Sequence, residues 1–153
     1  MEKIEHKTFR DNRGSYTPIP TNVLGMEWDQ CSVSVNDMEY TFRGLHYQTN
    51  PYQTKYVKVI KGKIIDFMVD LETGETEYLI MDENSAVLIP NNKAHGFLTL
   101  VPNTIVVYMS KGEYNPDSEH SLLWWKNEEV FNVVSHYSGS NEVVLSEKDA
   151  NGK

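Results

Sequence analysis

Two histidines stand in segments whose residue types could carry acid–base chemistry. His46 follows Arg43 closely, within the run Gly44–Gln48, and His95 lies in the run Pro90–Phe97 between two expected strands. Histidine titrates near neutral pH and can take up or deliver a proton during catalysis. A lone histidine is nevertheless more often an ordinary core or surface residue, so each of these needs partners.

Candidate partners are a lysine, a tyrosine and a short acidic segment. Lys55 begins an expected strand, and a lysine on the concave face of a barrel is costly unless it meets an anion or a carboxylate. Tyr114 is followed by Asn-Pro, so its hydroxyl would be held in a rigid turn, although packing is the commoner role of tyrosine. The segment Leu145–Asp149 reads, by itself, as a solvated charged stretch.

The histidines do not complete a metal site. The run Pro90–Phe97 is similar to the second half of the bipartite cupin motif, whose metal-binding members use His-x-His and a glutamate in the first half. Here the first half is His46-Tyr47-Gln48, without the second histidine. A mononuclear site needs three or four ligands, so we expect no metal. The sequence has no glycine-rich phosphate loop and no Gly-x-Ser-x-Gly, so we also expect no nicotinamide or ATP and no serine nucleophile.

The elements that position these residues are predicted to be strands. In Lys55–Leu71 the residues alternate: Ile65, Phe67, Val69 and Leu71 share one face, and Ile64, Asp66, Met68 and Asp70 share the other. Further short strands are expected at 77–81, 85–90, 96–101 and 104–110, separated by Gly, Pro and Asn turns. This spacing favours an all-β sandwich or barrel. Only 127–134 has a weak helical pattern.

Composition fits one domain over residues 1–153. Hydrophobic residues make up 39% and charged residues 24% of the chain, and the mean hydropathy is −0.51. The net charge is −8 and the basic residues do not cluster, which argues against nucleic acid as a partner.

No apolar run is long enough to span a bilayer, and the chain has no signal-like start. Cys31 is the single cysteine. We therefore expect a cytoplasmic protein without disulfides or membrane attachment. An anionic substrate would need a local basic pocket.

Taken in order, these segments resemble the dTDP-4-dehydrorhamnose 3,5-epimerase family over nearly the whole chain. The most specific motif is Arg-Gly-Leu-His-Tyr-Gln. The matching segments are Phe9–Gly14, Phe42–Gln48, Gln53–Lys55, Gly62–Asp70, Pro90–Phe97, Tyr114–Pro116 and Ser146–Asp149.

The resemblance implies a cupin-like jelly-roll barrel, a homodimer with exchanged strands, and no metal or cofactor. It implies an isomerase that inverts C3 and C5 of dTDP-4-dehydro-6-deoxyglucose through an enolate, in dTDP-L-rhamnose biosynthesis. Its implied catalytic residues are His46 as base, Asp149 as the partner of that base, Lys55 facing the 4-keto oxygen, and Tyr114 as acid. Its implied substrate-binding residues are Arg13, Arg43, Gln30, His95 and Lys148.

Two alternatives stay open at this point. Ser15 and Pro18 stand where the family usually has an aromatic residue and a glutamate, in a stretch that helps to form the base pocket. A 3- or 5-mono-epimerase, or an epimerase of a GDP- or CDP-linked 4-keto sugar, therefore remains an alternative. A non-catalytic sugar-binding cupin is disfavoured, because a binding protein has no need of an acid and a base together.

Overall fold

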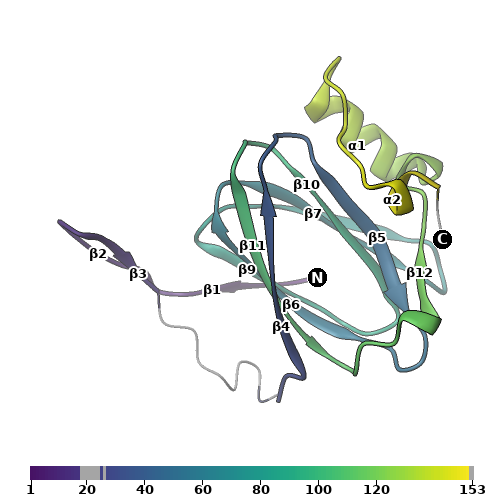
Figure 1. Ribbon diagram of the computed structural model, residues 1–153, viewed down its shortest axis with the longest axis horizontal. Coiled ribbons are helices and arrows are strands. Elements are labelled where there is room, and N and C mark those ends of the chain that lie inside the picture. The colour runs from purple at the N-terminus through teal and green to yellow at the C-terminus, as the bar shows by residue number, and fades with distance from the viewer. Residues whose placement is uncertain (18–24, 26, 152–153) are drawn as a thin grey trace.

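Two antiparallel sheets of five strands face one another in the computed structural model, which describes residues 1–17, 25 and 27–151 (Figure 1). The first sheet contains β1 (Glu2–Glu5), β9 (Ser85–Ile89), β6 (Thr54–Lys61), β11 (Thr104–Lys111) and β4 (Gln30–Asn36), in that order. The second contains β12 (Glu119–Ser121), β5 (Phe42–Gln48), β10 (Lys93–Thr99), β7 (Ile64–Asp70) and β8 (Thr76–Met81). The structure confirms the predicted all-β class.

The alternation of β7 separates two apolar cores. Ile64 and Met68 face the interior between the sheets, where they pack with residues of β6, β9 and β11. Ile65, Phe67 and Val69 face the other way and pack against helix α1 (Glu128–Ser138). Each core is built from side chains at alternate positions, as expected for strands that are buried on both faces.

The helical segments lie near the C-terminus, as predicted. Helix α1 begins after Asn127, whose side chain accepts a hydrogen bond from the Val130 amide at 3.0 Å, and it covers the outer face of the second sheet (Figure 1). Two short 3-10 helices, η2 (Pro116–Ser118) and η3 (Trp124–Lys126), flank β12. A second helix, α2 (Glu147–Asn151), was not expected from the sequence.

A hairpin of β2 (Phe9–Asp11) and β3 (Gly14–Tyr16) projects from the barrel (Figure 1). Among the described residues, no helix is long and apolar enough to cross a membrane.

Candidate active site

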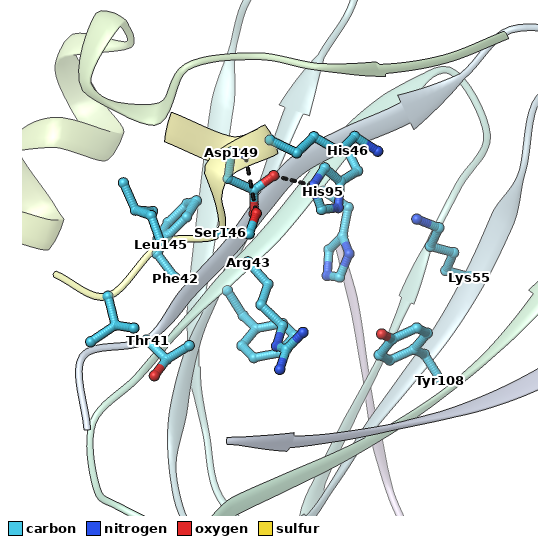
Figure 2. A pocket seen from close by; sticks show the side chains of 13 residues that line it. Thr41, Phe42, Arg43, His46, Lys55, His95, Tyr108, Leu145, Ser146 and Asp149 are labelled. Atoms are coloured by element: carbon cyan, nitrogen blue, oxygen red, sulfur yellow. Dashed lines mark hydrogen bonds and ion pairs between the residues drawn. The ribbon is translucent and has the colours of Figure 1, made fainter. Parts of the chain in front are cut away.

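A cavity of about 320 Å³ opens between the two sheets and contains most of the residues singled out in the sequence (Figure 2). Lys55 and Tyr108 project into it from the first sheet, and Arg43, His46 and His95 from the second. The segment that leads into α2 closes one side. The full lining consists of Thr41, Phe42, Arg43, His46, Lys55, His95, Phe97, Tyr108, Val144, Leu145, Ser146, Lys148 and Asp149.

His46 and Asp149 form a close pair at the wall of the cavity. His46 Nε2 lies 2.5 Å from Asp149 Oδ1, and the backbone N–H of Gly44 donates to Asp149 Oδ2 at 3.2 Å. An ionised carboxylate only accepts hydrogen bonds, so Nε2 carries the proton and Nδ1 is left with a free lone pair. Burial alone would raise the pKa of Asp149, but its hydrogen bond to His46, the charge of His46 and the Gly44 amide bring that pKa below its usual value.

The chain brings Asp149 to His46 through contacts with the start of β5. Thr41 and Val144 form an isolated parallel bridge, and the Phe42 amide donates to the Val144 carbonyl at 3.0 Å. Ser146 Oγ then accepts a hydrogen bond from the Asp149 amide at 3.1 Å, which starts the turn of α2. The side chain of Asp149 is consequently buried, although the segment reads as solvated in the sequence.

Lys55 and Tyr108 form the cationic and phenolic part of the opposite wall. They lie on the paired strands β6 and β11, where Ser110 faces Lys55 and Tyr108 faces Val57. Burial lowers the pKa of the Lys55 ammonium, while the charges of Glu119 and Asp66 act in the opposite direction. Burial raises the pKa of Tyr108, with Arg43 opposing it, so the phenol stays protonated at neutral pH. No role for Tyr108 could be predicted from the sequence.

Arg43 is held at the cavity by the neighbouring edge strand. Its Nε donates to Asn36 Oδ1 at 2.6 Å and its guanidinium also donates to the Val35 carbonyl at 3.3 Å. Gln30 lies at the start of the same strand, β4, where its side-chain amide donates to Ser32 Oγ at 3.1 Å. Gln30 is exposed and does not line the cavity.

His95 is also paired with a carboxylate. Its Nε2 lies 2.7 Å from Oδ2 of Asp66, a completely buried residue of β7. The sequence pattern placed Asp66 on the same strand face as Ile64 and Met68 but gave it no function. A charged residue between apolar neighbours was the available signal, because a buried carboxylate is costly without a partner. Within the described residues, no three His, Cys, Asp or Glu side chains gather in a way that could hold a metal ion.

Tyr114 and Lys148 meet at the rim through Glu119. The Tyr114 hydroxyl donates to Glu119 Oε2 at 3.0 Å, and Lys148 Nζ lies 3.0 Å from Glu119 Oε1. Tyr114 is 54% exposed and does not line the cavity, whereas Lys148 does. The hydrogen bond to Glu119 raises the pKa of Tyr114.

Arg13 lies on the hairpin outside the barrel. Its guanidinium pairs with Asp11 of the same hairpin at 2.6 Å and does not reach the cavity. Pro18, one of the two departures from the family pattern, lies outside the described residues.

Comparison with known proteins agrees with this arrangement. The family model described as dTDP-4-dehydrorhamnose 3,5-epimerase matches residues 1–153. A relative of that name from Methanothermobacter thermautotrophicus is 31% identical over 165 residues, which cover 98% of this chain and 86% of the relative.

Two solved structures superpose on nearly the whole chain. The Legionella pneumophila dTDP-6-deoxy-D-glucose-3,5-epimerase in complex with dTDP-4-keto-L-rhamnose has a TM-score of 0.83 at 28% identity, covering 99% of this chain and 85% of that one. A 3'-monoepimerase from Streptomyces bikiniensis in complex with dTDP-quinovose has a TM-score of 0.80 at 25% identity, covering 98% and 81%.

The fold and the cavity therefore define a cupin-like barrel of the nucleotide-sugar isomerases. Within that class, the chain belongs to the dTDP-4-dehydrorhamnose 3,5-epimerase family. The predicted family, the cupin-like fold and the prediction of an isomerase are thus confirmed.

Proposed function

We propose that this protein inverts C3 and C5 of dTDP-4-dehydro-6-deoxyglucose, as a step of dTDP-L-rhamnose biosynthesis. The observation that carries the proposal is the pair of His46 with the buried Asp149 on one wall of a cavity whose other wall presents the Lys55 ammonium. The names of the relatives support the same substrate class.

His46 acts as the base in this proposal. The protons on C3 and C5 are acidic only because the resulting carbanion delocalises onto the 4-keto oxygen. A histidine near neutral pKa suits their removal, and Asp149 orients the ring and stabilises the imidazolium that forms. Lys55 supplies a preorganised positive charge for the enolate oxygen.

Tyr108 is the acid that we propose, in place of Tyr114. Inversion requires that a proton reach the carbon from the face opposite the base. Tyr108 lines the cavity from the sheet opposite His46 and its pKa is raised by burial, so a proton is available there. The Tyr114 hydroxyl donates to Glu119 at the rim, and we propose that Tyr114 contacts the nucleotide end of the substrate.

The diphosphate is proposed to bind between basic groups at the cavity. Arg43 and Lys148 both line it, and guanidinium and ammonium groups are the usual partners of phosphate oxygens. This local positive charge would attract an anionic substrate that the net charge of −8 would otherwise repel.

Neither Arg13 nor Gln30 lines the cavity of its own chain, and substrate binding by Gln30 stays a prediction from the family resemblance. We propose a homodimer that exchanges its N-terminal strands, so that Arg13 reaches the cavity of the second copy. The hairpin of β2 and β3 projects away from its own barrel, and the Arg13 side chain is 85% exposed. The dimer acts in the cytoplasm as a single-domain enzyme.

The test is proton NMR of the purified protein with dTDP-4-dehydro-6-deoxyglucose in D2O. Loss of both the C3 and C5 proton signals, abolished by His46→Asn, is the expected result. Exchange at one carbon only would establish a mono-epimerase, like the 3'-monoepimerase from Streptomyces bikiniensis. No exchange with dTDP-, GDP- or CDP-linked 4-keto sugars would contradict an epimerase and favour a sugar-binding protein.

A further inference from the structure

We propose that Asp66 is a positioning residue for the epimerisation, which holds His95 so that its Nδ1 faces the sugar in the cavity. This inference rests on the proposed function, in which Asp66 has no other role.

Asp66 occupies a place where an apolar residue would be expected. It is completely buried on β7, and the neighbours on the same face of that strand, Ile64 and Met68, belong to the apolar core between the sheets. Burying a carboxylate costs free energy unless the charge is paired and hydrogen-bonded. A purely structural requirement would be met at lower cost by an aliphatic side chain.

The partner of Asp66 is a residue of the cavity. Oδ2 lies 2.7 Å from Nε2 of His95, which is itself 7% exposed and lines the cavity from β10. A carboxylate at Nε2 fixes the proton on that nitrogen and leaves Nδ1 as the one available to a ligand. The arrangement repeats that of His46 with Asp149, and the two histidines face each other in the pairing of β5 with β10.

Only one of the two oxygens of Asp66 has a hydrogen-bond partner within the part of the chain that the structure describes. Oδ1 is buried and, among the described residues, has no hydrogen-bond partner. The charge of Asp66 also acts on Lys55 across the cavity, where it opposes the lowering of the lysine pKa by burial. The carboxylate therefore influences two groups at the sugar end, one by contact and one through its charge.

Asp66→Asn tests this role while it keeps the size of the side chain. We expect kcat to fall by about tenfold or more with a much smaller change in KM, because the lost interaction orients a group at the reacting sugar and leaves nucleotide contacts intact. Asp70→Asn is the matched control: Asp70 lies on the same face of β7 but pairs with Lys93 outside the cavity, and kcat should stay within about twofold.

Asp66→Leu and a double-mutant cycle separate positioning from folding. The leucine variant removes the buried charge and is expected to melt no lower than the wild type, yet to lose activity as the asparagine variant does. Combining Asp66→Asn with His95→Asn should lower kcat little further than His95→Asn alone, because both changes remove one interaction.

Three results would overturn the inference: wild-type kcat in Asp66→Asn or Asp66→Leu, losses that only follow the fraction of unfolded protein, or fully additive effects with His95→Asn. Each is measured against a wild type that exchanges the C3 and C5 protons. A wild type without exchange would contradict the proposed function itself, so the two failures are distinct.

Discussion

His46 and Asp149 are 103 positions apart in the chain, yet His46 Nε2 and Asp149 Oδ1 lie 2.5 Å apart. The carboxylate reaches the histidine because the chain before α2 pairs with the start of β5, through Val144 and Phe42. In the proposed reaction the pair makes Nδ1 of His46 the proton acceptor, since Nε2 is committed to the carboxylate.

Asp149→Asn should therefore lower kcat on the order of 10³-fold, because an amide does not enforce the same tautomer or stabilise the imidazolium. The rate of C3 and C5 proton exchange in D2O measures the effect. Glu147→Gln, on the exposed side of the same helix, is the control and should retain wild-type activity. Equal losses in the two variants would show that the helix, and not the carboxylate, is what matters.

Tyr108→Phe and Tyr114→Phe distinguish the two candidate acids. Without the acid, His46 can still remove a proton and return it to the same face. Tyr108→Phe should therefore keep part of the deuterium exchange while losing inversion by roughly 10²-fold or more. Tyr114→Phe should retain the rate of inversion and change mainly KM. Chiral analysis of the product sugar decides the matter, and the opposite pattern would restore Tyr114 as the acid.

Lys55→Met should make the protein more stable and less active. Burial lowers the pKa of Lys55, so below that lowered pKa the ammonium is charged in both the folded and unfolded states and its desolvation cost is fully present. The gain from Lys55→Met should accordingly be full at pH values below the lowered pKa and shrink as pH rises from that pKa toward 10.5, where the unfolded lysine also loses its proton.

Denaturant unfolding at pH 7 and at higher pH measures this gain, and kcat should fall by about 10²-fold or more because the enolate loses its cation. Lys61→Met, at an exposed position of the same strand, is expected to change neither quantity appreciably. A Lys55→Met variant that is less stable than the wild type would contradict the sign of this argument.

Gly44→Ala should destabilise the fold by about 3 kcal/mol or more. Gly44 has φ +127°, and a Cβ built there would lie 2.6 Å from Gly96 Cα and 2.7 Å from the His95 carbonyl oxygen. Gly74 has φ +77° with open space around it, so Gly74→Ala carries only the backbone strain and should cost about 1 kcal/mol. Thermal unfolding measures both stability losses. Comparable losses in the two variants would contradict the prediction, because they would mean that the backbone shifts to relieve the close contact with β10.

Much of the barrel could be predicted from period-two patterns in single strands. The two faces of β7 were assigned correctly because Ile65, Phe67 and Val69 alternate with Ile64 and Met68. The strands β1 and β4 were not predicted: β1 has a mostly charged sequence, and β4 exposes Val33 and Val35 on its outer face. Such strands are defined by their partners in the sheet and not by their own composition.

The roles of the site residues could be predicted from the sequence only through the family resemblance. Histidine and lysine types could be noted, but the pairing of Asp149 with His46 depends on tertiary contacts of α2, and that of Asp66 with His95 depends on the register of β7 with β10. Tyr108 was noted from the sequence but received no role, because a tyrosine within an apolar strand has the pattern of a core residue. Its role becomes apparent once β11 is seen to line the cavity.

The placement of Asp149 on α2 has a consequence for how activity is lost on heating. Helix α2 has only five residues, and the chain before it joins the sheet through an isolated bridge at Val144. His46, in contrast, lies on β5, which pairs with a strand on each side. Segments held by few contacts open locally at a lower free-energy cost than the ladder strands. Local opening of this segment would separate Asp149 from His46 and abolish activity while the barrel stays folded. Thermal inactivation should therefore occur below the temperature of global unfolding and reverse on cooling.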